Sequence, residues 1–356
     1  MMLRPSKDNV APREMSPHLD DPARLRARLA HYLTQVSGGD VSVEKLVRFP
    51  VGFSWITYGV TLRRADGLVD VILRLGPPYG LFAPYSAKPE FLAFQALAAS
   101  GVPVPKAYYW SDDPDILGAP FFICEKVRGE APIPWVSGAA GTLDEARRES
   151  LARDFIDALA NLHGFDWQST PLGRDGREVT TGTVAAQQIA YWRAAHERWQ
   201  MRPHPMLHHA FAWLSDNKVA AKRVSLVHGD YRIGNFLEVD GRITAILDWE
   251  LVHLGDPHED LAWAMLPQYR GGSGLVCRLA SEDDFLRRYE EQAGFAIDSR
   301  ALRFYSILSL VKLALTHMAA ARCFEEGKFN DMRMPAMATQ ITPVLRQIQK
   351  ALESGA

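Results

Sequence analysis

The sequence contains few of the residues that mark several protein classes. Three of its 356 residues are cysteines, Cys124, Cys277 and Cys323, and they lie far apart in the chain. Their spacing matches no metal or redox motif, and an odd, sparse set is typical of proteins from a reducing compartment. We therefore expect a cytoplasmic protein.

The chain also lacks an excess of basic charge and a long uninterrupted apolar segment. Its formal net charge is −2, whereas a general nucleic-acid binder normally has a basic surplus. Residues 1–15 are polar and contain no apolar signal core. The most apolar long stretch, residues 304–321, is interrupted by Lys312 and His317, which indicates a buried helix. We expect neither a nucleic-acid nor a membrane partner.

The remaining composition is that of an ordinary globular protein, with 47% hydrophobic and 23% charged residues. Residues 1–18 are rich in proline and charge, so we expect them to be disordered. The apolar spacing beyond them predicts both strands and helices. The predicted strands are 43–49, 54–63, 69–75 and 120–127, and the predicted helices include 20–36, 143–164, 183–199, 204–217, 281–293, 298–325 and 331–352.

One stretch concentrates polar residues of the kinds that act in catalysis and metal binding. Residues 226 to 250 read LVHGDYRIGNFLEVDGRITAILDWE. Asp240-Gly241 lies between two alternating runs, which is the strongest short hairpin signal because both turn residues tolerate φ > 0. A hairpin would return Asp248 to the side of Asn235, with Asp230 just ahead of both. Two carboxylates and an amide oxygen would then converge, a set that suits Mg²⁺ and leaves positions for substrate phosphates.

This stretch resembles the catalytic core of the aminoglycoside phosphotransferase-like small-molecule kinases, which are relatives of choline kinases and, more remotely, of protein kinases. His228-Gly229-Asp230 stands where protein kinases have H-R-D, and Asp248-Trp249-Glu250 stands where they have D-F-G. The spacing from Asp230 to Asn235 is also that of the kinase motif. The resemblance implies that Asp230 is the catalytic base and that Asn235 and Asp248 hold Mg²⁺. It gives His228 a structural role in orienting the loop.

Weaker resemblances upstream concern the nucleotide. A turn that contains Gly52, Phe53 and Ser54 resembles the kinase loop that covers the ATP phosphates. Val71-Ile72-Leu73-Arg74 resembles the kinase V-A-I-K strand, with Arg74 in place of the lysine. Arginine keeps the charge and can bind phosphate in a bidentate manner, although its plane and reach differ. The alternative is a surface arginine at a strand end.

Two more nucleotide assignments follow from the same resemblance. Glu90, which opens a predicted helix, resembles the helix-C glutamate that pairs with the strand cation; as an ordinary first-turn acid it would also be favoured by the helix dipole. Glu125 to Val127 would form the hinge that bonds adenine. Arg74 followed by Pro77 fits the acyl-CoA-dehydrogenase-associated branch, which favours a hydroxylated metabolite, such as an acyl derivative, as acceptor.

The resemblance implies an α+β, two-lobed protein-kinase-like fold. A small N-terminal antiparallel-sheet lobe would span residues 19–126, and a larger, mainly helical C-terminal lobe would span 127–356. The implied activity is an ATP- and Mg²⁺-dependent transfer of the γ-phosphate to a hydroxyl of a small molecule.

Two other hypotheses remain open. The first is a nucleotide-binding pseudokinase or sensor, which remains open because Arg74 stands where the kinase motif has lysine. The second is a metal-dependent hydrolase, whose candidate ligands are His228, Asp230, Asp248, His253 and His258.

Overall fold

The computed structural model describes residues 21–49, 54–132, 143–174, 179–328 and 331–354. Contacts divide the chain into two compact units. The first, called the sheet unit, consists of residues up to 95 together with 105–127. The second, called the helical unit, consists of residues 96–104 together with 128–356. Residues 1–18, which were predicted to be disordered, lie outside the described residues.

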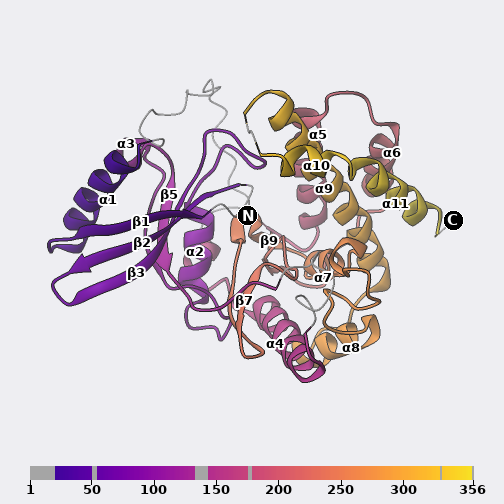
Figure 1. Cartoon of the computed structure of the whole chain (residues 1–356). Coiled ribbons are helices and arrows are strands. Elements are labelled where there is room, and N and C mark those ends of the chain that lie inside the picture. The colour runs from indigo at the N-terminus through magenta and orange to yellow at the C-terminus, as the bar shows by residue number, and fades with distance from the viewer. Residues whose placement is uncertain (1–20, 50–53, 133–142, 175–178, 329–330, 355–356) are drawn as a thin grey trace. The chain divides into compact units, whose positions relative to one another are not determined.

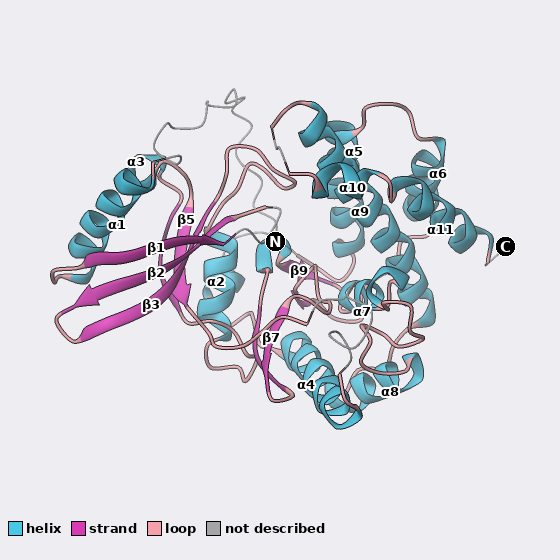
Figure 2. Ribbon diagram, in the orientation of Figure 1, coloured by secondary structure: helices cyan, strands magenta, loops and turns pink. Residues whose placement is uncertain are grey.

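The sheet unit contains a five-stranded antiparallel sheet with the order β1-β2-β3-β5-β4. Figure 1 labels its elements, and Figure 2 separates strands from helices by colour. The strands are β1 (Ser42–Phe49), β2 (Ile56–Arg64), β3 (Gly67–Leu75), β4 (Ala107–Ser111) and β5 (Phe121–Glu125), and the helices are α1 (Pro22–Ser37), α2 (Lys88–Leu97) and α3 (Pro114–Leu117).

Helix α1 covers part of this sheet because its apolar residues recur every fourth position. Leu25, Leu29 and Leu33 are buried in one cluster with inward-facing residues of β1, β2, β3 and β5. The Asp21 carboxylate accepts hydrogen bonds from two N–H groups of the first turn, and Gly38 ends the helix in the left-handed conformation, as is common after a helix.

The helical unit is organised around one long helix, α9 (Ser299–Glu325), which packs against α5, α6, α7, α10 and α11. The other helices are α4 (Glu145–Gly164), α5 (Val184–Trp199), α6 (Pro205–Asp216), α7 (His258–Ala264), α8 (Glu282–Ala293), α10 (Arg333–Ala338) and α11 (Ile341–Glu353). Short 3₁₀ helices occur at η2 (Pro171–Arg174), η3 (Trp249–Leu251) and η4 (Pro267–Tyr269).

Among the described helices, α9 is the one whose length and composition would allow it to cross a membrane, with a mean hydropathy of 1.4 in its most apolar window. However, 83% of that window is buried inside the protein. A core helix gives this result, in agreement with the predicted buried helix at 304–321.

The C-terminal end corrects one prediction. A single helix was expected at 331–352, whereas the structure has α10 and α11, separated at Thr339 and Gln340. Pro343 lies in the first turn of α11, where its missing N–H group causes no loss. A continuous helix would need that N–H to reach the carbonyl of Thr339, so the chain breaks before the proline.

Two small antiparallel ladders hold the motif stretch. Strand β6 (Ser225–Val227) pairs with β9 (His253–Gly255), and β7 (Phe236–Val239) pairs with β8 (Arg242–Ile246). The predicted hairpin is present, and its turn residues Asp240 and Gly241 have φ of 49° and 79°. The Ile246 N–H donates to the Pro103 carbonyl at 2.8 Å, which ties residues 96–104 to the helical unit.

The α+β class predicted from the sequence is confirmed. The N-terminal part is built on an antiparallel sheet, and the remainder is mainly helical.

Candidate active site

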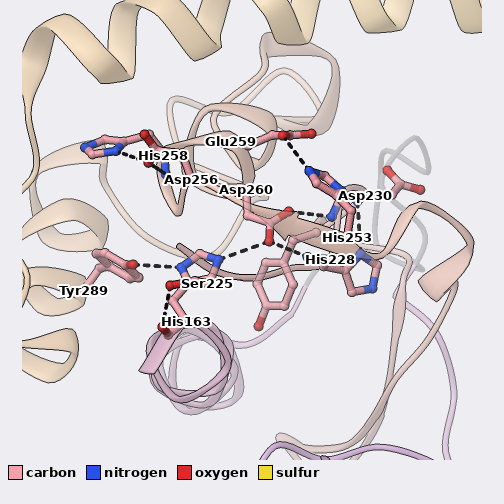
Figure 3. A network of polar contacts seen from close by, with 12 residues as sticks. His163, Ser225, His228, Asp230, His253, Asp256, His258, Glu259, Asp260 and Tyr289 are labelled. Carbon is pink, nitrogen blue, oxygen red and sulfur yellow. Dashed lines mark hydrogen bonds and ion pairs between the residues drawn. The ribbon is translucent and has the colours of Figure 1, made fainter. Parts of the chain in front are cut away.

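The loop between β6 and β7 contains Asp230, and a buried carboxylate holds its backbone (Figure 3). Asp260 of α7 accepts hydrogen bonds from the N–H groups of His228 and Gly229, both at 2.8 Å. It also contacts His163 Nε2 at 3.1 Å. Burial raises the pKa of Asp260, but the contact with His163 and the loop N–H groups outweigh that effect and keep its pKa below the usual value. Asp260 is therefore a charged anchor for the loop.

His228 fixes the next peptide group. Its Nδ1 accepts the N–H of Asp230 at 3.0 Å, so Nε2 has the proton and donates to the Leu247 carbonyl at 2.9 Å. Complete burial lowers the pKa of His228, which favours this neutral form. This geometry is that of a residue that orients the loop.

Gly229 has to be a glycine for a steric reason. Its φ is 84°, and a Cβ atom there would lie 2.6 Å from the carbonyl oxygen of Leu251. A side chain would therefore push the loop away from η3.

Three donors hold the Asp230 carboxylate in place. Its Oδ1 accepts from Arg232 Nε at 3.0 Å and from Trp263 Nε1 at 2.6 Å. Its Oδ2 accepts from Asn235 Nδ2 at 2.6 Å. Burial opposes the charge of Arg232, but the carboxylates of Asp230 and Asp248 outweigh it and raise the pKa of Arg232. The position of the Asp230 side chain is thus fixed by its surroundings.

Asn235 connects Asp230 to the returning strand. Its Nδ2 also donates to the backbone carbonyl of Asp230 at 2.9 Å, and its own carbonyl accepts the N–H of Leu247 at 2.8 Å. Leu247 immediately precedes Asp248, whose φ of 63° lies in the left-handed region. The structure therefore brings together Asp230, Asn235 and the backbone beside Asp248.

The donor set here fits a hard divalent cation. The amide nitrogen of Asn235 faces Asp230, so its amide oxygen points the other way, and Asp248 supplies a carboxylate on the adjoining turn. In the described part of the chain, no group of three or more His, Cys, Asp or Glu residues could hold a metal ion. One carboxylate and one amide oxygen are what Mg²⁺ commonly takes from a protein that leaves the other positions to water and phosphates.

The histidines proposed as ligands of a metal-dependent hydrolase are engaged elsewhere. His253 contacts the Leu251 carbonyl through Nδ1 at 2.8 Å and Glu259 through Nε2 at 3.0 Å. His258 contacts Asp256 through Nδ1 at 2.6 Å and accepts the N–H of Asp298 at Nε2, at 2.9 Å. Both nitrogens of each ring are used within the protein, so neither ring has a lone pair left for a metal.

In the sheet unit, Arg74 and Glu90 form an ion pair. The distance from Arg74 Nη1 to Glu90 Oε1 is 2.7 Å, and the two side chains are 13% and 2% exposed. The guanidinium also lies 5.6 Å from the ring centroid of Trp55 and 5.8 Å from that of Phe122. Arg74 is therefore not a surface arginine at a strand end.

The other predicted nucleotide contacts are spread along the same unit. Ser54 is buried, and Gly52 and Phe53 lie outside the described residues. Glu125 ends β5, and its N–H already donates to a carbonyl of the neighbouring chain segment. Val127 follows the end of that strand.

Trp263 is the functional candidate that sequence reasoning missed. It lies three residues after Asp260 on α7, and residues three apart in a helix lie on the same side. The three-residue spacing from the acidic residue Asp260 was the available signal in the sequence.

Comparisons with known proteins show which proteins the chain is similar to. A curated relative, acyl-CoA dehydrogenase family member 10 of Mus musculus, is 30% identical over 243 residues, which is 67% of this chain and 22% of the relative. Acyl-CoA dehydrogenase family member 11 of Mus musculus is 30% identical over 316 residues, 83% of this chain and 39% of the relative. The chain thus spans well under half the length of these relatives.

Solved structures share the fold over nearly their whole length. A candidate aminoglycoside phosphotransferase from Ralstonia eutropha JMP134 has a TM-score of 0.72 at 23% identity, covering 92% of this chain and 98% of that one. A thermostable mutant of aminoglycoside phosphotransferase APH(4)-Ia, solved with ADP and hygromycin B, has a TM-score of 0.61 at 17% identity, covering 92% and 99%.

The sequence profile described as the phosphotransferase enzyme family matches residues 45–305. This range is well over half of the chain and includes the Arg74–Glu90 pair, the Asp230 loop and the β7–β8 hairpin. The chain belongs to the phosphotransferase enzyme family.

Proposed function

We propose that the protein is an ATP- and Mg²⁺-dependent kinase that transfers the γ-phosphate to a hydroxyl group of a small molecule. The observation that supports this most is the hydrogen-bonded unit of Asp230, Asn235 and the turn at Asp248. In this unit the Asn235 amide nitrogen bonds to Asp230, which leaves the Asn235 amide oxygen and the Asp248 carboxylate as the separate groups for a metal ion. Phosphoryl transfer needs such a separation of the base from the metal ligands.

Asp230 is the proposed base. Among the described residues, Oδ1 accepts two hydrogen bonds and Oδ2 accepts one. A carboxylate oxygen has two lone pairs, so Oδ2 retains capacity for a further donor. The acceptor hydroxyl would therefore donate its proton to Oδ2, while Oδ1 keeps the carboxylate oriented.

Asn235 and Asp248 are the residues that would hold Mg²⁺. When bound, the ion would neutralise charge on the phosphate oxygens. The bonds from Asn235 Nδ2 to Asp230 keep the amide oxygen turned away from the base. The base and the metal ligands would therefore not compete for the same groups.

Arg74 is the proposed contact for the α- and β-phosphates, and Glu90 orients its guanidinium. Gly52, Phe53 and Ser54 would contribute donors near the phosphates, and the backbone of Glu125 to Val127 would bond adenine. The APH(4)-Ia structure with ADP supports nucleotide use in this fold.

The proposed acceptor is a hydroxylated metabolite, such as an acyl derivative, in the cytoplasm. This acceptor class rests on the names of the curated relatives, of which the chain covers 22% and 39%. The APH(4)-Ia complex contains hygromycin B, which is also a hydroxylated small molecule. Neither nucleic acid nor membrane is part of the proposal.

The test measures ATP affinity and acceptor-dependent ADP release in Asp230→Asn and Asp230→Ala. Turnover should fall by roughly 10²–10⁴, the usual range for loss of a positioned acid–base group, while Mg²⁺–ATP affinity persists. Both variants are needed because the asparagine would place an amide group opposite Asn235 Nδ2, whereas alanine leaves that amide undisturbed.

The outcomes separate the hypotheses. Wild-type turnover in both variants would exclude Asp230 as the base. A wild-type protein that binds Mg²⁺–ATP but phosphorylates none of a panel of hydroxylated metabolites and antibiotics would favour the pseudokinase hypothesis.

A further inference from the structure

Lys312 is an unusual residue for the middle of an apolar core helix. It lies on α9, and its side chain is 2% exposed. Its ammonium donates to the backbone carbonyl of Gly229 and lies 3.5 Å from Glu259 Oε1. Removing an ammonium group from water is costly unless polar partners compensate for it, so these contacts require an explanation.

The position of that ammonium is informative because of the peptide group that it contacts. The carbonyl of Gly229 and the N–H of Asp230 belong to one planar peptide unit. Lys312 binds the carbonyl, and His228 Nδ1 accepts the N–H at 3.0 Å. Both ends of the peptide that directly precedes Asp230 are therefore fixed, which restricts rotation of that peptide plane.

The same ammonium touches the side chain that holds the carboxylate. Lys312 Nζ lies 4.5 Å from the ring centroid of Trp263, within range of a cation–π interaction. The Nε1 of that indole donates to Asp230 Oδ1 at 2.6 Å. One buried cation thus contacts both the backbone before Asp230 and the indole bonded to its carboxylate.

A purely structural ion pair explains these contacts less well. The closer partner of Glu259 is His253, at 3.0 Å, whereas the distance from Glu259 to Lys312 is 3.5 Å. A buried ion pair is often no more stable than apolar residues of similar volume. The contacts specific to Lys312 are those with Gly229 and Trp263, and both lead to Asp230.

We propose that Lys312 and Trp263 form a buried cation–indole clamp that positions Asp230, Lys312 through the peptide before it and Trp263 through its carboxylate. The clamp rests on the proposed function, because it assigns both as positioning residues for the base of that reaction. Neither touches the reacting atoms. Fixing the carboxylate in advance lowers the barrier because a small misplacement of a reacting group costs much of the rate.

A matched pair of tryptophans allows a clean test. Trp192 also lies near the ammonium, with its ring centroid 5.5 Å from Lys312 Nζ, but its Nε1 has no hydrogen-bond partner among the described residues. Trp263→Phe and Trp192→Phe each keep an aromatic face for Lys312 and remove one indole N–H. We expect kcat to fall by about 10- to 100-fold in Trp263→Phe and to change by less than about 2-fold in Trp192→Phe. The KM for ATP should stay near the wild-type value in both.

A double-mutant cycle shows whether Trp263 acts through Asp230. In an Asp230→Ala background, Trp263→Phe should cause no further loss of rate, because the carboxylate that it orients is gone. A merely structural role would lower the rate by the same factor in both backgrounds. Additive effects, or a Trp263→Phe variant with wild-type kcat, would overturn the clamp.

The test of Lys312 requires a variant that still folds when the buried ammonium is removed. Lys312→Met leaves Glu259 buried without its cation, so Lys312→Met/Glu259→Gln is made as well, which removes both charges and retains an acceptor for His253. We expect either folded variant to lose about 10- to 100-fold in kcat. Amide hydrogen exchange should also become faster across residues 228–231, whereas Trp192→Phe leaves it unchanged.

Turnover and amide exchange together separate the assignment of Asp230 as the base from the clamp formed by Lys312 and Trp263. If neither Asp230 variant affects turnover, the base assignment fails even when Lys312 is shown to anchor the loop. If the Asp230 variants lose activity but the Lys312 variants keep wild-type kcat and slow exchange, the clamp alone is wrong.

Discussion

The sheet unit and the helical unit each contain a cation that is paired with a glutamate and lies near aromatic rings, and the proposed roles of the two cations differ. Arg74 is partly buried and Lys312 is buried, and each is paired with a glutamate and lies within 6 Å of two aromatic rings. Arg74 lies 2.7 Å from Glu90 and is proposed to bind a ligand. Lys312 lies 3.5 Å from Glu259, and its closest contact is with the backbone carbonyl of Gly229.

The difference lies in what surrounds each cation. Arg74 keeps 13% of its side chain exposed, whereas Lys312 is 2% exposed. The greater exposure of Arg74 favours its proposed role in binding a ligand, and the nearly complete burial of Lys312 favours its proposed role in positioning the loop. Mutations in each unit test whether this division holds.

The largest effect should come from Asp248, because the helical unit is proposed to supply the metal ligands. Asp248→Asn keeps the size of the side chain and tolerates the φ of 63°, but it removes the charge. We expect turnover to fall by roughly 10³ or more, because charge neutralisation at the phosphates is lost. Steady-state ADP release at saturating Mg²⁺ measures it.

Asp240 provides the matched control for that change. It is also an aspartate in the left-handed region, with φ of 49°, at the exposed tip of the same hairpin. Asp240→Asn should keep wild-type turnover. If Asp248→Asn behaves like Asp240→Asn, the metal assignment is wrong.

A smaller effect is expected at Arg74 and should appear in binding. Arg74→Ala should weaken ATP affinity by about 10- to 100-fold, since charge-assisted hydrogen bonds to phosphate contribute about 1.5–3 kcal/mol each. Arg74→Lys should lose less, because it keeps the charge. Calorimetric titration with Mg²⁺–ATP gives both values.

The surface pair Arg63–Glu44, on the same sheet, is the control. Arg63→Ala removes an arginine from an ion pair in which the two side chains are 58% and 41% exposed. Its ATP affinity should match the wild type. Equal affinities in the alanine and lysine variants of Arg74 and in the wild type would leave Arg74 without a ligand role.

The sequence predicted the parts of the site that lie close together in the chain. Asp230, Asn235 and Asp248 occur within one motif, and the Asp240-Gly241 turn indicated the hairpin that returns the chain. Local turn chemistry was enough there because the contacts it sets are local.

The sequence did not predict the contacts made over long separations. Lys312 is 83 residues from Gly229, and Trp263 is 33 residues from Asp230. In the sequence, Lys312 was only an interruption of an apolar helix. Which carbonyl a buried cation meets depends on how α9 packs against the loop, and periodicity specifies the buried face of a helix but not its neighbour.

The last prediction concerns His317, a buried base in the helical unit, and its effect should appear in stability and not in activity. His317 lies on α9 five residues after Lys312, and its Nδ1 has no hydrogen-bond partner among the described residues. Burial lowers the pKa of His317 from 6.5 to about 4. The neutral ring is therefore favoured in the folded protein, while the unfolded chain takes up the proton more readily.

The sign of the pH dependence follows from that shift. Between about pH 6.5 and 4 the unfolded state binds more protons at this position, so the free energy of unfolding decreases as the pH falls. The full contribution, present above pH 6.5, is about 3 kcal/mol for a pKa lowered from 6.5 to about 4. His317→Leu should lose less stability than the wild type between pH 7 and 4.5, as measured by urea unfolding at each pH.

The exposed His209 is the control, and His209→Leu should follow the wild-type curve. Parallel curves for wild type and His317→Leu would mean that burial leaves the pKa of His317 near its ordinary value. The interior around α9 would then tolerate a charge at His317 as it does at Lys312.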